Sequence, residues 1–384
     1  MKIAKVVIEN FRHIEKLELD FTDSLGRVRD LILLVGPNGC GKTSVLDAIA
    51  LALGPVTGIT ATRPDLTLSP RSIVRQSASF AQVSCEVRFG ADEVAATHEA
   101  LQSIPPQPGL GKDLRWLQEL SLAHRARDAT AVWRYPDPKK ESAFGRTECS
   151  PDNHDLLFGG KAWYTHYRRN GPANQQMFRR VGGVYTFDQQ RTGAGMSIPA
   201  DIRALIQKFT AVNGAPGPQA PEEWAKNPRN ILLSLALQAL IPAAGVDAPD
   251  VFKQVKDLYA RICTPHQIVG PIRDESGVLD VVFSNGKYEF RYDGLSSGEQ
   301  MVLLFLIRMA TEQIHQSVVL VDEVELHQHP IWQSKLLHML TQIGEGNQII
   351  ATTHSPYLRS LYSRDAVRDL GELEPHPEPV EARP

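Results

Sequence analysis

The sequence predicts an α/β fold, and three observations favour this class. The short apolar run Leu31–Val35 is typical of a buried strand and leads through a glycine-rich loop into a helix that carries Val45, Leu46, Ile49 and Leu53 on one side. Two later apolar runs, Ser317–Val321 and Asn347–Thr352, are also typical of buried strands. Each of these two strands ends in polar residues, so we expect the chemistry to lie at strand ends.

Composition limits the possible classes of protein. The chain has 384 residues and a formal charge of −3, which argues against a generally basic nucleic-acid coat protein but allows a local basic patch. Its four cysteines are scattered without paired zinc spacing, as expected for reduced thiols in a cytoplasmic protein. We expect no signal peptide and no membrane association, because Met1 leads directly into a strand-like segment and apolar runs are short.

The loop Gly36–Thr43, with the sequence GPNGCGKT, fits the phosphate-binding pattern G-x-x-x-x-G-K-[ST]. Its glycines allow backbone N–H groups to converge on phosphate oxygens at a helix N-terminus. In this pattern Lys42 reaches the β- and γ-phosphates, and Thr43 binds Mg²⁺. The sequence therefore predicts a nucleoside triphosphate site.

Alternating patterns predict strands around this loop and farther along the chain. The expected strands are Lys2–Asn10, Ile14–Phe21, Arg27–Val35, Ala81–Phe89, Ala131–Tyr135, Gly183–Asp188, Ile268–Ile272, Leu279–Phe283 and Lys287–Tyr292. Asn285-Gly286 predicts a hairpin turn between the last two. Residues 199–263 are expected to be mostly helical, with Ile231–Ile241 as the strongest apolar helix.

The segment from about Ala91 to Arg180 is the hardest to interpret. It contains proline clusters and one predicted helix near Leu114–Ala126. Trp163–Arg169 mixes aromatic with basic side chains, which is compatible with a nucleic-acid or partner surface. A solvated loop with a few buried aromatics is the favoured interpretation.

A second polar loop, Leu295–Gln300 (LSSGEQ), precedes a strongly apolar helix predicted at Met301–Ile314. Small residues at a helix N-terminus offer hydroxyl and backbone N–H groups to an anion. The same residues are also typical of a capped helix, with Ser296 or Ser297 at the cap and Glu299 in the first turn.

The two later buried strands end in residues suited to phosphate hydrolysis. Asp322 follows the first of them, where it can bind Mg²⁺, and Glu323 can act as general base on water. His354 follows the second, where it can hydrogen-bond a γ-phosphate. His327 and His329 allow a metal site, but a loop before Pro330 is the favoured interpretation.

These motifs, in this order, resemble the ABC-type ATPases of the SMC, RecF and OLD-like group. The resemblance covers about residues 1–55 and 264–360, through VVIENFRHIEKLELDF, GPNGCGKTSVLDAIA, LSSGEQ, VLVDEVELHQHP and TTHSPYL. The form DE-x-E-x-H-x-H-P is similar to the stand-alone ATPases of anti-phage systems: PtuA of Septu, retron-associated ATPases, AriA of PARIS and the ATPase half of OLD nucleases.

The resemblance assigns roles to individual residues. It implies a Walker A loop that binds ATP and Mg²⁺ through Asn38, Gly39, Gly41, Lys42, Thr43 and Ser44, and a Q-loop at Gln189 or Gln190 that also binds Mg²⁺. It places the signature at Ser296, Ser297 and Gly298. It further implies Walker B at Asp322 and Glu323 and a switch histidine at His354. Lys42, Glu323 and His354 would be catalytic. Two positions depart from the pattern: Ser297 replaces the usual glycine, and Val324 replaces a frequent proline.

The resemblance also implies an architecture: an ABC-type P-loop ATPase head with an antiparallel β subdomain, an inserted helical subdomain and no long coiled coil. The expected segments are an N-terminal ATPase lobe at 1–90, an insertion at 91–182, a Q-loop and helical subdomain at 183–265, a C-terminal ATPase lobe at 266–361 and a tail rich in Pro and Glu at 362–384. That tail is too short for a catalytic domain, so effector activity is expected on another chain.

Two functions follow from the resemblance as hypotheses. In the first, two subunits sandwich ATP head to tail, hydrolyse it slowly, and control a separate effector, such as a nuclease or toxin, in anti-phage defence. In the second, the protein is a RecF-like DNA-repair ATPase, and residues Lys161 to Arg180 contact DNA or RNA. An ABC transporter subunit is a less favoured third class.

Overall fold

The computed structural model describes residues 1–53, 72–102, 128–139, 146–149, 180–188, 227–240, 251–273, 279–311, 314–326 and 328–371. The chain divides into two compact units. Unit 1 comprises Met1–Thr186, Gln316–Val324 and Gly346–Pro384, and unit 2 comprises Phe187–His315 and Glu325–Glu345. Each unit is therefore assembled from segments that lie far apart in the sequence.

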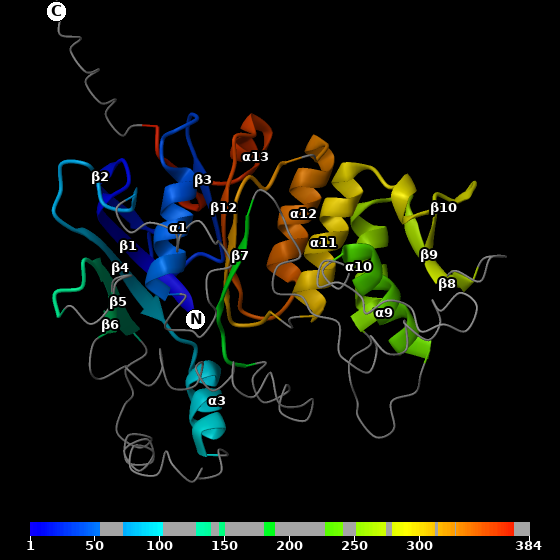
Figure 1. The fold of residues 1–384 in the computed structure, drawn as a ribbon, viewed down its shortest axis with the longest axis horizontal. Coiled ribbons are helices and arrows are strands. Elements are labelled where there is room, and N and C mark those ends of the chain that lie inside the picture. The colour runs from blue at the N-terminus through cyan, green and yellow to red at the C-terminus, as the bar shows by residue number, and fades with distance from the viewer. Residues whose placement is uncertain are drawn as a thin grey trace, which may run out of the picture. The chain divides into compact units, whose positions relative to one another are not determined.

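The central sheet of unit 1 contains the three buried strands expected from the sequence. Its strands are β3 (Leu31–Val35), β7 (Val184–Phe187), β11 (Val318–Val321), β12 (Gln348–Thr352) and β13 (Val367–Asp369), in the order β13-β3-β12-β11-β7. β12 pairs in parallel with both β3 and β11. The carboxyl ends of these three strands therefore meet at one edge of the sheet (Figure 1).

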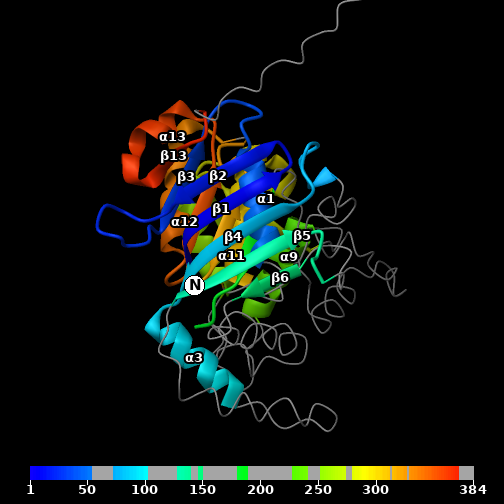
Figure 2. The same cartoon turned by 90° about the vertical axis from the view of Figure 1, so that its left-hand side faces the viewer.

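A second sheet of unit 1 is antiparallel, as expected. Its order is β2 (Ile14–Asp20), β1 (Lys2–Phe11), β4 (Ala81–Arg88), β5 (Asp128–Tyr135) and β6 (Arg146–Cys149). Helix α1 (Lys42–Leu53) packs against strands of both sheets and is buried along most of its length, which joins the two sheets through one hydrophobic core (Figure 2). Phe11 and Trp133 meet edge to face in this core. Helix α3 (Ala91–Gln102) follows β4.

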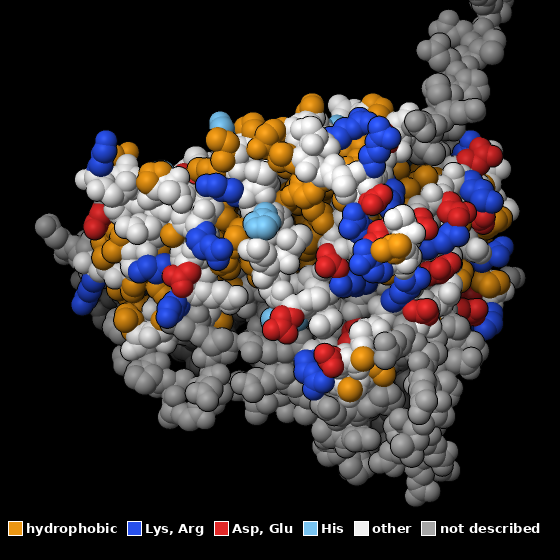
Figure 3. Space-filling model, turned by 180° about the vertical axis from the view of Figure 1, so that it is seen from behind, with side chains coloured by type: hydrophobic (Ala, Val, Ile, Leu, Met, Phe, Trp, Pro, Cys, Tyr) orange, Lys and Arg blue, Asp and Glu red, His pale blue; other side chains and the backbone are white. Residues whose placement is uncertain are grey.

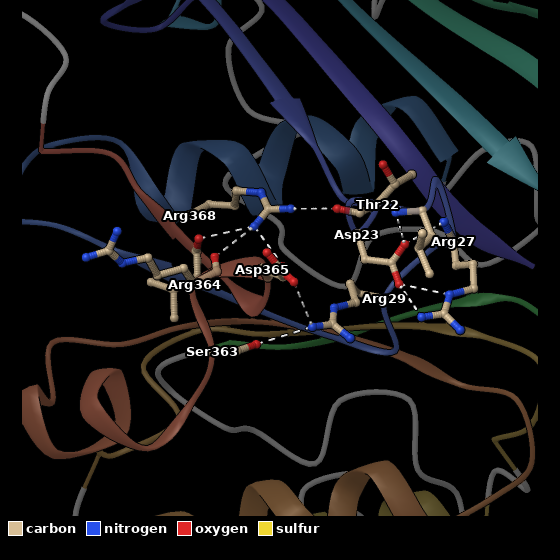
Figure 4. Close-up of polar contacts among 10 residues, drawn as sticks. Thr22, Asp23, Arg27, Arg29, Ser363, Arg364, Asp365 and Arg368 are labelled. Carbon is tan, nitrogen blue, oxygen red and sulfur yellow. Dashed lines mark hydrogen bonds and ion pairs between the residues drawn. The ribbon is translucent and has the colours of Figure 1, made fainter.

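The chain after His354 closes the outer edge of the parallel sheet. It forms α13 (Pro356–Leu361), the short helix η7 (Arg364–Ala366) and β13, which pairs in parallel with β3. Arg368 donates to the carbonyls of Asp20 (2.6 Å) and Thr22 (3.2 Å), and Arg29 donates to Ser363 (Figure 4). Residues 362–371, which the sequence analysis grouped with the tail, are therefore part of the folded unit.

The described residues of unit 2 form four α-helices and a small antiparallel sheet. The helices are α9 (Pro228–Leu240), α10 (Val251–Ile262), α11 (Ser297–Thr311) and α12 (Pro330–Gln342); the strands are β8 (Gln267–Arg273), β9 (Leu279–Ser284) and β10 (Glu289–Arg291), followed by the short helix η6 (Tyr292–Gly294). The hairpin turn predicted at Asn285-Gly286 is confirmed, because the Asn285 side chain accepts the N–H of Lys287 and Gly286 has φ +84°. Among the described residues there is no long coiled coil.

The predicted starts of one strand and one helix differ most from the structure. β3 begins at Leu31 rather than Arg27, because the Asp23 carboxylate accepts the N–H groups of Leu25 and Arg27 and holds this segment in a turn. α11 begins at Ser297 rather than Met301, so the polar loop supplies its first turn. The predictions at Leu114–Ala126 and Trp163–Arg169 lie outside the described residues. No helix in the described part is long and apolar enough to span a bilayer.

Candidate active site

The glycine-rich loop lies between β3 and α1 in unit 1, as the sequence predicts. Gly39 (φ +79°) and Gly41 (φ +103°) adopt left-handed conformations that side chains disfavour, which lets the loop turn its backbone N–H groups inward. Lys42 is buried in the first turn of α1, and its Nζ donates to the carbonyls of Gly36 (3.0 Å) and Pro37 (2.9 Å). The ammonium group is thus held against the loop that would receive phosphates.

The turn between β1 and β2 lies beside the same loop, which the sequence analysis did not foresee. Arg12 forms a 2.8 Å ion pair with Asp47 on α1. A Cβ atom added to Gly41 would lie 2.8 Å from Nε2 of His13. Neither Arg12 nor His13 belongs to the phosphate-loop pattern. Their position beside the phosphate loop is seen only in the three-dimensional structure, where the turn between β1 and β2 lies next to Gly41 and α1.

The acidic pair follows β11 at the edge where β3 also ends. Asp322 is buried, and the hydroxyl of Thr43 lies 3.1 Å from each of its carboxylate oxygens. Glu323 is half-buried and has φ +47°, a strained conformation for this residue type that is typical of functional sites. The structure therefore brings together Walker A and Walker B residues that are 279 positions apart.

Thr352, at the end of β12, links the two acidic residues. Its hydroxyl donates to Asp322 Oδ1 (2.7 Å) and accepts the backbone N–H of Glu323 (2.7 Å). The side chain is fully buried, so these bonds are shielded from water. Thr352 is the first residue of the segment TTHSPYL, but the sequence predicts for it only the end of a strand and assigns it no role.

His354 follows two residues later and is exposed. β12 lies between β3 and β11, so His354 leaves the sheet at the edge that carries Lys42 and Asp322. Ser355 then caps α13 by accepting the N–H of Leu358, which ends the strand and starts the helix. The order of strands, rather than proximity in sequence, gathers these residues.

The donor atoms at this edge fit Mg²⁺. Thr43 and Asp322 supply oxygen ligands, and Mg²⁺ commonly takes one or two protein oxygens, with waters and substrate phosphates completing its shell. Within the described ranges no group of three or more His, Cys, Asp or Glu side chains could hold a metal ion. His329 instead caps α12 by accepting the N–H of Ile331, and His327 lies outside the described residues.

The signature residues belong to unit 2. Ser296 caps α11: its hydroxyl donates to Glu299 Oε2 (2.8 Å) and accepts the N–H of Glu299 (3.3 Å), while its own N–H donates to Oε2 (3.0 Å). Ser296 and Ser297 are exposed, whereas Gly298 is buried and its carbonyl accepts a 2.9 Å bond from Gln328. Exposed hydroxyls at the positive end of a helix can bind phosphate oxygens.

One predicted site residue has no structural account. Gln189 and its alternative, Gln190, lie outside the described residues, so the Q-loop remains a prediction. The remaining candidates fall into two groups, one at the strand ends of unit 1 and the other at the start of α11 in unit 2.

Comparisons with known families support this organisation. The family model "AAA ATPase domain" matches residues 1–58, and "AAA domain, putative AbiEii toxin, Type IV TA system" matches residues 223–360. The retron Ec83 probable ATPase of Escherichia coli is 20% identical and covers 93% of this chain and 69% of its own. A solved SMC head bound to the C-terminal winged-helix domain of ScpA covers 96% of both chains, with 15% identity and a TM-score of 0.46; we draw no conclusion from that score.

A match to one further relative shows the family to which the chain belongs. The Septu protein PtuA of Bacillus thuringiensis is 31% identical over 376 residues, which cover 93% of this chain and 72% of that protein. The match spans both groups of candidate residues, those at the strand ends of unit 1 and those at the start of α11. The chain belongs to the PtuA family of SMC- and RecF-like ABC-type ATPases, which is related to the ATPases of anti-phage defence systems.

Proposed function

We propose that this chain binds and hydrolyses ATP as a head-to-tail dimer and that the nucleotide state of the dimer controls a separate effector protein in anti-phage defence. The contact between the Thr43 hydroxyl and both oxygens of Asp322 carries the enzymatic part of the proposal. It joins the phosphate loop to the acidic strand end, which is the pairing that an ATP–Mg²⁺ site requires.

In this proposal each residue at the edge of unit 1 has one task. Lys42 neutralises charge on the β- and γ-phosphates, and Thr43 and Asp322 hold Mg²⁺, which supplies further charge neutralisation when bound. Glu323 accepts a proton from the attacking water, with its backbone fixed by Thr352. His354 donates a hydrogen bond to the γ-phosphate and so responds to its loss.

The signature serine is proposed to come from a second copy of the chain. In ABC-type ATPases, as the resemblance implies, Walker A and B of one subunit face the signature of the other. Exclusion of water from the interface would then strengthen the interaction of Ser296 with the transferred phosphoryl group. Hydrolysis would remove that contact and separate the subunits, so the dimer can serve as a switch.

Control of an effector in defence is supported by the names of the relatives, which include a Septu protein and a retron ATPase. Figure 3 shows acidic and basic side chains interspersed on the part of unit 1 visible in that view. Ion pairs such as Lys5–Glu18 and Arg359–Asp369 form in this unit. A mixed surface of this kind does not favour DNA binding through that face. ATP-dependent binding of DNA with a steep salt dependence would support the repair alternative instead.

Glu323→Gln tests the enzymatic part. The change removes the proton acceptor with little change in shape, so we expect ATP turnover to fall by roughly 10²- to 10⁴-fold while ATP binding is retained. Glu18→Gln, on the exposed surface of the same unit, is the matched control and should leave turnover unchanged. Wild-type turnover in Glu323→Gln would refute the assignment of the general base.

Mixed subunits test the shared site. Neither Lys42→Ala nor Ser296→Arg should support turnover alone. A heterodimer of the two retains one composite site with both residues intact, so turnover should reappear on mixing. If the mixture is no more active than either variant, the head-to-tail dimer is wrong.

A further inference from the structure

The carboxylate of Glu299 holds the signature serine with one oxygen and is itself held through the other. Oε2 takes both bonds from Ser296. Oε1 is hydrogen-bonded to Nδ1 of His266 and accepts a 3.0 Å bond from the hydroxyl of Tyr259. Glu299 is therefore the buried centre of a network that connects α10 and the residue before β8 to the start of α11.

The surroundings keep this carboxylate ionised. Burial alone would raise the pKa of Glu299, but the hydrogen bonds from His266, Ser296 and Tyr259 together lower it. Burial raises the pKa of the Tyr259 phenol and of the nearby Cys263 thiol, so both stay protonated at neutral pH. Lys335 on α12 is the other charged group that acts on this cluster, through Cys263.

A serine hydroxyl has only one proton to donate. In this structure the hydroxyl of Ser296 donates its one hydrogen bond to Glu299. A phosphate oxygen would need the same hydrogen bond, because it can only accept. The availability of Ser296 thus depends on how strongly Oε2 attracts its hydroxyl. Donors to Oε1 draw off negative charge and weaken that attraction, while they keep the carboxylate in place.

We propose that His266 is a positioning residue for the signature serine: through Glu299 it orients Ser296 and allows the Ser296 hydroxyl to redirect its hydrogen bond from Glu299 to a phosphate oxygen. His266 precedes β8 and lies 33 positions from Glu299, outside every recognised motif. Its ring meets Phe290 edge to face at 5.3 Å, which fixes the orientation of the imidazole. This inference rests on the proposed ATPase function.

The test compares two replacements of His266. His266→Phe keeps the ring and its packing against Phe290 but removes Nδ1, so we expect the turnover number to fall on the order of tenfold. His266→Asn places an amide N–H near the position of Nδ1 and should restore turnover to within about threefold of wild type. ATP binding to the Walker A loop, measured without turnover, should be the same in both.

Hydrogen exchange gives a readout that does not depend on hydrolysis. The amide protons of Ser296 and Glu299 are bonded within the capping box, so His266→Phe should speed their exchange and His266→Asn should not. His338, exposed on α12 of the same unit, is the matched control. His338→Phe and His338→Asn should leave exchange at α11 and turnover unchanged.

The outcomes separate this inference from the function on which it rests. Equal losses in His266→Phe and His266→Asn, or no change in either turnover or exchange, would overturn the inference. If the wild-type protein neither binds nor hydrolyses ATP, the proposed function fails, and exchange at Ser296 still decides the role of His266. If His266→Phe does not fold, His266→Gln replaces it in the test. Its amide lies one bond farther from the backbone than that of Asn, so we expect a turnover number below that of His266→Asn.

Discussion

The strand-end edge of unit 1 and the signature loop of unit 2 are both small polar sites, yet they are held in different ways. The edge of unit 1 is placed by sheet topology, because β3, β12 and β11 are neighbours and their carboxyl ends coincide. The signature loop is held by side chains from elsewhere in the unit: His266 and Tyr259 on Glu299, and Gln328 on Gly298.

The difference shows which information a sequence motif carries. Backbone topology fixes Lys42 and Asp322, so a local pattern after a buried strand is enough to find them. The side chains that hold the signature have no local pattern of their own. We therefore expect changes at the edge of unit 1 to affect chemistry, and changes in the scaffold of unit 2 to affect stability as well.

Thr352→Val should produce the largest effect among the residues outside the motifs. The change keeps the shape of the side chain but removes the bonds to Asp322 and to the N–H of Glu323, so we expect turnover to fall by about 10- to 100-fold. Thr352→Ser keeps the hydroxyl and should remain close to wild type. A thermal melt that is unchanged beside the lost turnover would show that Thr352 positions the acidic pair and that the fold of this edge does not depend on its hydroxyl.

Arg229→Ala should have the largest effect on the scaffold of unit 2. Arg229 binds Asp280 through two bonds, of 3.1 and 2.6 Å, and Asp280 is only 1% exposed. Removal of the guanidinium leaves a buried carboxylate without its counter-charge, at a cost of about 3 kcal/mol. Faster hydrogen exchange in β9 would measure this loss.

The control for Arg229 is an ion pair in unit 1 whose arginine is exposed to solvent. Arg27 pairs with Asp23 but is 72% exposed, so Arg27→Ala should cost about 0.5 kcal/mol or less. Equal losses in the two variants would contradict the view that unit 2 depends on buried side-chain pairs.

Replacement of Glu299 should have a smaller effect, on the pH dependence of the stability of unit 2. The folded pKa of Glu299 is lowered below the ordinary value of 4.5, so the unfolded state binds more protons in acid. The stability that it contributes is present above the unfolded pKa and is lost as pH falls through the folded pKa. Glu299→Gln should therefore flatten the dependence of stability on pH below about pH 5, measured by urea unfolding. If Glu299→Gln loses stability below about pH 5 as steeply as the wild type, the hydrogen bonds to Glu299 do not lower its pKa.

Much of the fold was predictable because each signal was local. Alternation predicts β1, β2, β4 and β5 of the antiparallel sheet of unit 1 but not the short β6, and Asn285-Gly286 predicts the hairpin turn between β9 and β10 of unit 2. The start of α11 was placed too late, because Ser297 and Gly298 have low helix propensity and only the Ser296 cap shows that the helix has begun. The segment after Tyr362 was grouped with the tail, because a three-residue strand such as β13 has no periodicity to detect.

The same limit applies to the candidate site. Lys42, Thr43, Asp322 and His354 follow buried strands in recognisable patterns, whereas Thr352, His13 and His266 acquire a place only through pairing with distant residues. Their contacts depend on the register of strands and on helix packing, which a single sequence does not determine.

The pairing of β13 with β3 also has a consequence for how the protein is made. β3 emerges early in synthesis, but its two neighbours, β12 and β13, begin only at Gln348 and Val367. The strand that carries the phosphate loop therefore waits for more than three hundred residues before either edge can be paired. Because the growing chain exposes an unpaired apolar strand throughout this time, we expect it to be prone to aggregation until β12 and β13 have been made. A chain that ended before Gln348 would lack both neighbours of β3 and with them the assembled edge that carries Lys42 and Asp322.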